Sequence, residues 1–124
     1  MAGFTQAYAQ TLLDLAFPTS GASEFIGYST NGTTESTAVI NARTPVGATG
    51  WASATAAQPS VKANGVQLTT AAAVGAGTIT HYAVFTELTS GVQMIDWTPL
   101  GTSKTLAIGE VGTWAIGALA ITLD

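Results

Sequence analysis

His81 is the only histidine in this 124-residue chain and the first residue to consider for chemistry, because an imidazole is a common general base near neutral pH. It lies in the stretch THYAVFTEL, where strand-like alternation places Ile79 and His81 on one face. A general base needs an acid or a nucleophile within hydrogen-bond reach. In the neighbouring run VQMIDWTPL the only carboxylate is Asp96. We expect a structural histidine in an apolar row, and an Asp96–His81 pair is the alternative.

Other catalytic and metal-binding patterns are absent from the sequence. The chain has no cysteine, which excludes thiol nucleophiles, disulfides and thiolate metal sites. Zinc and calcium each need several ligands brought together, whereas the seven carboxylates are scattered singly. The polar stretch STNGTTES is the closest approach to an oxygen-rich loop. A phosphate-binding loop and a Gly-x-Ser-x-Gly elbow are also missing, so we expect no enzyme activity, no metal and no cofactor.

Aromatic residues are the remaining candidates for recognition, because Trp and Tyr commonly anchor interfaces and can stack on sugar rings. Tyr28, Trp97 and Trp114 are among them, and the two tryptophans lie in strand-like runs where core packing is expected. Trp51 instead stands in a stretch of Gly, Ala and Ser. We predict that Trp51 lies at an interface, and burial beneath its own loop is the alternative.

Near the N-terminus, residues 5–16 have the spacing of an amphipathic helix. Its large apolar side chains recur at intervals of four, four and three residues and so share one face: Phe4, Tyr8, Leu12 and Leu15. Thr5 is suited to cap the start of this helix, and Pro18 to end it. Two roles fit the apolar face. It either closes one open end of the domain's own core or docks on a neighbouring subunit, with Phe4, Tyr8 and Leu12 as contacts.

From residue 24 onward, short β-like runs alternate with clusters of Gly, Asn, Pro and Ser, a pattern typical of a sandwich or barrel. The clearest hairpin joins TITHYAVFTEL to VQMIDWTPL through a turn at 89–91, and residues 47–60 read as a loop. The length is that of one domain. We predict an all-β fold for residues 1–124: a helix at about 5–16 and a small antiparallel β-sandwich or barrel at about 24–124.

The surface is predicted to be polar but nearly uncharged. Charged residues make up 8% of the chain, against about 25% in typical soluble domains. The net charge of −4 and the three scattered basic residues argue against binding to nucleic acid or to an anionic membrane. The N-terminus lacks the features of a signal peptide, and no apolar run is long enough to span a membrane. We expect synthesis in the cytoplasm and a surface made to touch protein.

The C-terminal half resembles a family of short tailed-phage virion proteins. The resemblance consists of a Thr-His-x-x-x-Phe strand, a Gly-containing turn, a Ser-Lys-Thr segment, a Gly-acid pair and a Gly-Ala-Leu-x-x-Thr-Leu-Asp ending. These elements are Thr80, His81 and Phe85; Gly91; Ser103, Lys104 and Thr105; Gly109 and Glu110; and residues 117–124. Upstream, Arg43 in NARTPV and the following Trp51 resemble the family's Tyr-Ala-Arg strand and its Trp, with Asn41 in place of an aromatic residue.

The resemblance implies a structural role, because members of such families are head decoration proteins or tail-fibre components without known catalytic residues. Our leading expectation is a capsid decoration, or cement, protein that forms a trimer. Its partner would be the major capsid protein on the outer surface of the assembled head. One alternative is a tail or tail-fibre component of the virion. Another is a carbohydrate-binding adhesin module that uses exposed tryptophans as a stacking platform.

Overall fold

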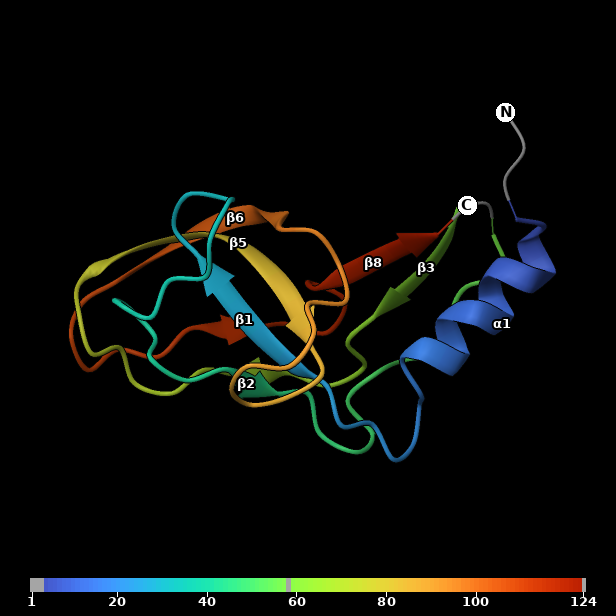
Figure 1. Ribbon diagram of the computed structural model, residues 1–124, viewed down its shortest axis with the longest axis horizontal. Coiled ribbons are helices and arrows are strands. Elements are labelled where there is room, and N and C mark those ends of the chain that lie inside the picture. Colours follow the sequence, from blue (N-terminus) through green and yellow to red (C-terminus); the bar gives the residue numbers. More distant parts are fainter. Residues whose placement is uncertain (1–3, 58, 124) are drawn as a thin grey trace.

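The computed structural model describes residues 4–57 and 59–123. Within them one helix and eight strands form an elongated molecule with the helix at one end (Figure 1). The elements are α1 (Gln6–Ala16), β1 (Phe25–Ser29), β2 (Thr44–Pro45), β3 (Ser60–Ala63), β4 (Leu68–Thr69), β5 (Gly77–Phe85), β6 (Thr98–Leu106), β7 (Thr113–Trp114) and β8 (Ala120–Leu123). The pairing is antiparallel throughout the described strands. The predicted class, a small all-β fold with one N-terminal helix, is confirmed.

The main sheet has four strands in the order β2-β1-β5-β6. The predicted hairpin is present, since β5 pairs with β6 and the Thr86 N–H donates to the Val92 carbonyl at 3.0 Å. Its turn contains Ser90 and Gly91 with φ angles of 57° and 72°. β6 extends further than either predicted run, because Thr98–Leu106 joins the end of VQMIDWTPL to the start of KTLAI in one strand.

The pairing of β5 with β6 is irregular between Ile79 and His81, and these two residues of β5 differ in burial. Ile79 is opposite Lys104, but His81 is already opposite Pro99, so β6 holds extra residues between these pairs. Ile79 and Tyr82 both lie in the core, whereas His81 is half-buried and outside the core cluster. The prediction that Ile79 and His81 share one face is therefore wrong, since Ile79 packs with Tyr82 in the core and His81 does not.

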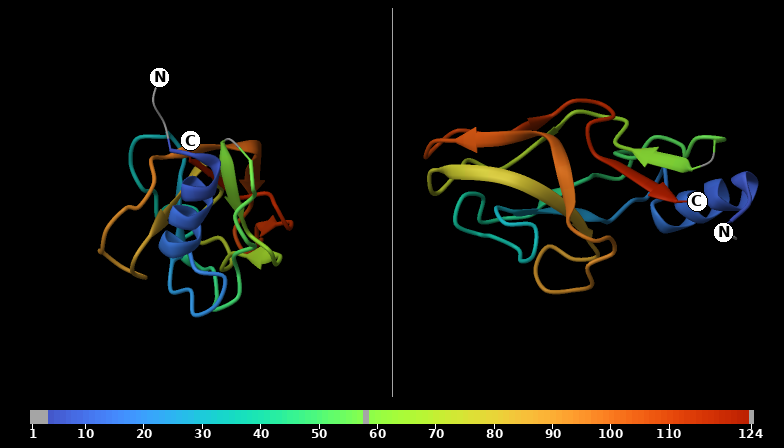
Figure 2. Two further views of the ribbon diagram at one scale, coloured as in Figure 1. Left: turned by 90° about the vertical axis from the view of Figure 1, so that its right-hand side faces the viewer. Right: turned by 90° about the horizontal axis from the view of Figure 1, so that it is seen from above.

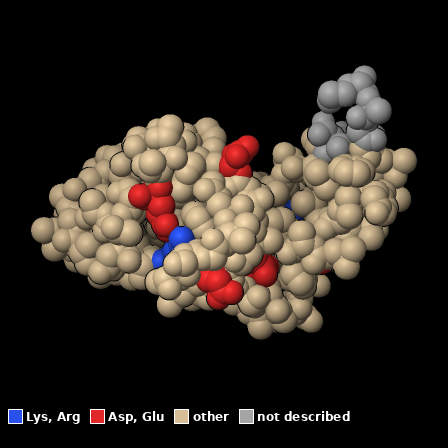
Figure 3. Space-filling model, viewed as in Figure 1, with Lys and Arg blue, Asp and Glu red and all other residues tan. Residues whose placement is uncertain are grey.

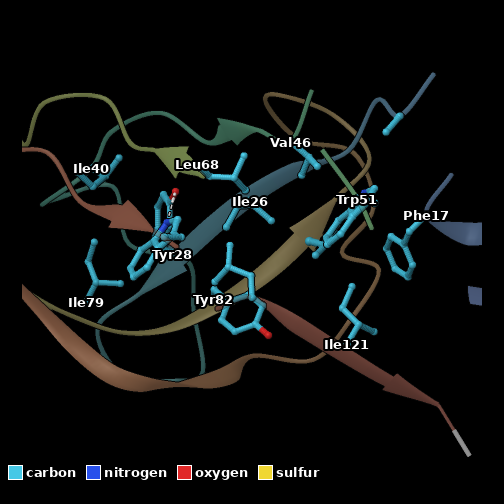
Figure 4. Packing of buried hydrophobic residues seen from close by; sticks show 14 of the residues in the cluster. Phe17, Ile26, Tyr28, Ile40, Val46, Trp51, Leu68, Ile79, Tyr82 and Ile121 are labelled. Atoms are coloured by element: carbon cyan, nitrogen blue, oxygen red, sulfur yellow. Dashed lines mark hydrogen bonds between the residues drawn. The ribbon is translucent and has the colours of Figure 1, made fainter. Parts of the chain in front are cut away.

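Two shorter pairs, β3-β8 and β4-β7, complete the described β structure. β3 and β8 run toward α1, which packs beside them at one end of the molecule (Figure 2). β3 was not predicted, because its sequence SVKA follows directly from the stretch read as a loop and includes a lysine. One hydrophobic cluster extends from Phe17 near the helix to Ile79 in the main sheet (Figure 4).

The hydroxyl and indole N–H groups of the tyrosines and of Trp114 in this core are hydrogen-bonded. The Tyr28 hydroxyl is hydrogen-bonded to the Thr44 hydroxyl, and the Trp114 indole N–H donates to Tyr28 at 3.4 Å. The Tyr82 hydroxyl donates to the Ala120 carbonyl. Burial raises the pKa of both Tyr28 and Tyr82 above its ordinary value, so both hydroxyls stay protonated at neutral pH. These bonds satisfy polar groups that would be costly to bury unpaired.

Candidate interaction surface

The contacts of His81 are those of a structural residue. Its Nδ1 lies 2.8 Å from the Thr80 hydroxyl, and its ring covers Gly32 so closely that a Cβ there would come within 2.8 Å. Gly32 also has a φ of +77°, which favours glycine. Asp96 is exposed and makes no ion pair with His81 among the described residues. The paired acid of the catalytic alternative is therefore not in place.

In the oxygen-rich loop STNGTTES, side-chain oxygens form hydrogen bonds with groups of the loop itself. The Asn31 side-chain oxygen accepts hydrogen bonds from the N–H groups of Thr33 and Thr34, at 2.9 and 3.1 Å, and the Ser29 hydroxyl donates to it at 3.0 Å. This is the local pattern of an Asx turn. In the part of the chain that the structure describes, no three His, Asp or Glu side chains gather as metal ligands.

Arg43, in the stretch NARTPV, uses its guanidinium group in hydrogen bonds and an ion pair with two loops of the protein. Its guanidinium forms two 2.8 Å bonds with the Glu35 carboxylate and donates to the carbonyls of Glu87 and Ser90, both at 2.7 Å. It also stacks over the Phe85 ring at 3.7 Å from the centroid. Arg43 thus fixes the turn of the β5-β6 hairpin to the loop after β1 and is not available to an external anion.

Trp51 lies in the core, which corrects the prediction that it contacts a partner. Its side chain is 2% exposed, and its ring packs edge-on against Phe17 with centroids 5.3 Å apart (Figure 4). Its indole N–H donates to the buried Glu24 carboxylate at 2.9 Å. The small residues of the surrounding loop let the chain close over the indole, so burial beneath the loop, the alternative, describes this structure.

The other tryptophans also offer no exposed stacking platform. Trp114 is buried as predicted, and Lys104 lies over its ring at 5.2 Å from the centroid. Trp97 is half-buried, and its ring lies 5.8 Å from that of Phe85. A groove between residues 100–104 of β6 and residues 113–118 runs past Trp114 but leaves its ring covered.

α1 begins as the sequence predicts but turns a different face toward the core. Thr5 is the N-cap, and its hydroxyl accepts a hydrogen bond from the Tyr8 N–H at 3.3 Å. The buried residues are Ala9 and Leu13, followed at the same spacing by Phe17. The helix therefore closes one end of the core, but with smaller side chains than those expected. In the described part of the chain, no helix has the length and apolar character needed to cross a membrane.

The side of α1 that faces the protein also carries a stripe of polar residues at intervals of four. Gln6 and Gln10 donate to the carbonyls of Ala56 and Ala54, and Asp14 accepts from the Ala54 N–H at 2.9 Å. The sequence pattern missed this anchor. The regular spacing of these polar residues could have indicated that they share one side of the helix. A prediction based on apolar periodicity instead places all polar residues on the side that faces solvent.

An ion pair completes the attachment of α1. The ammonium group of Lys62 on β3 lies 2.6 Å from the Asp14 carboxylate, and its side chain has no exposed surface. Burial acts to raise the pKa of Asp14, but hydrogen bonds from Lys62 and the Ala54 N–H, together with the Lys62 charge, hold that pKa below its ordinary value. Asp14 is therefore ionised at neutral pH and neutralises the buried lysine.

Apart from the buried Leu13, the large apolar side chains in and just before α1 lie on the side of the helix that faces away from the core. We call this surface the outer face; it consists of Phe4, Tyr8, Leu12 and Leu15. Tyr8 and Leu15 are 54% and 70% exposed, Phe4 is 41% exposed and Leu12 is half-buried. The rings of Phe4 and Tyr8 pack together with centroids 5.8 Å apart.

α1 thus differs from the usual amphipathic helix, whose large apolar side chains are all buried, because it buries Leu13 but exposes Tyr8 and Leu15 on the other side. On the face drawn in Figure 3, charged side chains form only small patches among uncharged residues. A row of large apolar side chains held outward by a polar anchor is the kind of exposed patch that marks a contact with another macromolecule. Phe4, Tyr8 and Leu12, the residues predicted as contacts, are placed together on it.

The fold and this surface define a class of protein: a small antiparallel β protein with an N-terminal helix that exposes several large apolar side chains. The chain matches the family Podophage GP4 fiber I protein gp80 over residues 4–122. It therefore belongs to this family of structural proteins of the short-tailed phage virion, as the resemblance predicted. No curated protein matches the chain significantly.

Proposed function

We propose that this protein is a subunit of a tail fibre of a short-tailed phage and that it has a structural rather than an enzymatic role. The observation that carries this proposal is the family match, which spans residues 4–122 and whose description names a fibre protein. It favours the tail-fibre alternative over decoration of the capsid surface, our leading expectation from the sequence.

The outer face of α1 supports a role in assembly. A fibre subunit must contact neighbouring subunits repeatedly, and an apolar, uncharged face can be desolvated at low cost. The outer face contains no charged residue, and the one acid of the helix, Asp14, is neutralised by Lys62. The polar anchor beneath the helix keeps this face outward before any partner binds, which limits the ordering cost of association.

The buried tryptophans give no support to the adhesin alternative. A glycan platform needs an aromatic face open to solvent, whereas Trp51 and Trp114 are buried and Trp97 is half-buried against Phe85. If the fibre contacts a host surface, we therefore expect the contact to involve other chains of the fibre, or parts of this chain other than its tryptophan rings.

Immunogold electron microscopy of intact particles tests the location. Antibodies raised against the purified chain are expected to label the tail region, and particles from a phage lacking the gene serve as the control. Antibody pre-absorbed with the purified protein checks specificity. Gold distributed evenly over the head, and absent from the tail, would overturn the fibre proposal in favour of capsid decoration.

A further inference from the structure

We propose that Asn31, in the loop that follows β1 (Figure 1), is the site at which the folded protein is deamidated, and that the Ser29 hydroxyl holds this site closed. The chain contains two Asn-Gly pairs, Asn31-Gly32 and Asn64-Gly65. Asparagine followed by glycine is the dipeptide most prone to deamidation, because glycine has no side chain to hinder ring closure. The proposal goes beyond the fibre role, since it concerns a chemical modification of the chain and not its place in the virion.

Deamidation of Asn31 requires its side chain to react with the next backbone nitrogen. The Gly32 nitrogen loses its proton and attacks the Asn31 Cγ, and the Nδ2 group takes up a proton and leaves as ammonia. The succinimide ring formed in this step then reacts with one water to give aspartate or isoaspartate, which adds one negative charge. The reaction is therefore slow wherever the glycine N–H is hydrogen-bonded and the asparagine amide is held in another position.

The Ser29 hydroxyl binds both reacting groups. It accepts hydrogen bonds from the Gly32 N–H at 2.9 Å and from the Asn31 N–H at 3.2 Å, and it donates to the Asn31 side-chain oxygen at 3.0 Å. Ser29 is itself fully buried at the end of β1. The Gly32 nitrogen is therefore tied to a strand of the main sheet, and its proton is already donated.

The Asn31 amide is also held by the residues that follow it. Its oxygen accepts from the N–H groups of Thr33 and Thr34, and its Nδ2 donates to the Thr34 hydroxyl at 3.2 Å. Donors on the oxygen polarise the amide, which by itself favours attack. Ring closure, however, brings the Cγ within bonding distance of the Gly32 nitrogen, so the side chain must leave Thr33 and Thr34. We therefore expect the restraint to outweigh the polarisation.

Packing against His81 removes the backbone freedom that makes an Asn-Gly pair reactive. The imidazole ring lies over Gly32, where a Cβ would come within 2.8 Å of it, and His81 is paired with Ser29 across β1 and β5. The loop must lift away from this ring before Gly32 can turn. Modification thus proceeds through local opening of the loop, and its rate follows the small open fraction.

The second pair, Asn64-Gly65, is closed more firmly. The Gly65 N–H donates to the Gly50 carbonyl at 2.8 Å, and the Asn64 side chain bonds to backbone groups 51 and 55 positions away. Asn64 has no exposed surface, so these bonds break only when a large part of the fold opens. Asn31 is exposed, and its bonds lie within its own loop and the end of β1. Asn31 is therefore modified before Asn64.

Peptide mass spectrometry of the full chain, incubated at mildly alkaline pH, measures the conversion at each asparagine. In the folded chain, Asn31 is expected to react at least about tenfold more slowly than in the same chain unfolded in urea, because only the open fraction reacts. Asn64 is expected to react more slowly still. The unfolded chain, in which neither pair is restrained, supplies the reference rate for both sites.

Ser29→Ala tests the hydroxyl. It removes three hydrogen bonds, so the rate at Asn31 should rise at least about fivefold. The rate at Asn64 in the same molecules should not change, which checks that the rest of the fold is intact. Ser36→Ala is the matched control, because the Ser36 hydroxyl lies in the same loop but bonds to the Ala38 N–H. Its rate at Asn31 should equal that of the native chain.

Hydrogen exchange of the unmodified chain tests the same contact without a substitution. The Gly32 amide proton should exchange at least about tenfold more slowly than in the unfolded chain, because it is bonded to Ser29. Three results would overturn the proposal: an Asn31 rate in the folded chain that equals the unfolded rate, modification of Asn64 before Asn31, or an unprotected Gly32 amide. A Ser29→Ala rate no higher than that of Ser36→Ala would overturn the part assigned to Ser29.

Discussion

The carboxylate of Asp14 on α1 lies 2.6 Å from the ammonium group of Lys62 on β3, although the two residues are 48 positions apart. Lys62 has no exposed surface, whereas the Asp14 side chain is 38% exposed. The pair fixes the helix to the β structure and, by placing the polar side of α1 inward, turns the outer face toward solvent. The two partners differ in burial, so their removal should have unequal costs.

Asp14→Asn should destabilise the protein by about 3 kcal/mol, because it leaves a buried ammonium without its counter-charge. The asparagine oxygen can still accept from the Ala54 N–H, so the change isolates the charge. Lys62→Met should cost less than about 1.5 kcal/mol, because the methionine fills the space and water can reach Asp14. Urea unfolding of both variants checks the order. Equal losses, or a larger loss for Lys62→Met, would contradict the unequal costs expected from the unequal burial of the two partners.

Acid should weaken the same attachment. The pKa of Asp14 is lower in the folded protein than its ordinary value of 3.8. Its contribution to stability is therefore complete above pH 3.8 and is lost as the pH falls through the lower folded value. The free energy of unfolding, measured from pH 6 down to pH 2, should fall more steeply for the native chain than for Asp14→Asn. Parallel curves would show that Asp14 is not linked to folding.

The sequence predicted those parts of the fold that depend on local signals. Thr5 caps α1, and the turn containing Ser90 and Gly91 joins β5 to β6, because capping and turn residues act over a few positions. The orientation of α1 was not predictable in this way. It depends on the burial of Leu13 and on the contact between Asp14 and Lys62, which form only in the folded chain.

The burial of Trp51 has the same explanation. A tryptophan among small residues reads as exposed, but here its indole N–H has an acceptor in Glu24, 27 positions away. Ile79 and His81 were assigned to one face, but Ile79 packs in the core with Tyr82 and Val84, so the alternation that a sequence pattern assumes breaks between Ile79 and His81, where the pairing of β5 with β6 is irregular. In each case a contact distant in sequence overrides a correct local pattern.

Arg43→Lys should destabilise the protein by about 2–3 kcal/mol, although it keeps the charge. Arg43 binds both oxygens of Glu35 and two carbonyls with a planar fork, and a lysine ammonium cannot make that set of bonds. Its side chain is 9% exposed, so water does not replace the lost donors. Lys104→Ala is the comparison, with an expected cost below about 1 kcal/mol, because Lys104 contributes a ring contact at 5.2 Å and no ion pair in the described structure. Thermal unfolding of both variants measures the difference, and a neutral Arg43→Lys would contradict the role assigned to Arg43.

Trp51→Phe should destabilise the protein by about 2–3 kcal/mol, because it opens a cavity and leaves the buried Glu24 carboxylate without the indole donor. Glu24→Gln should cost less, since an amide oxygen can still accept from the indole N–H. Chemical unfolding gives the two values.

The native chain's tryptophan emission should stay unchanged when bacterial cell-wall glycans are added, because Trp51 and Trp114 are buried. A saturable quench that disappears in Trp97→Phe would instead assign glycan binding to the half-buried Trp97 and revive the adhesin alternative.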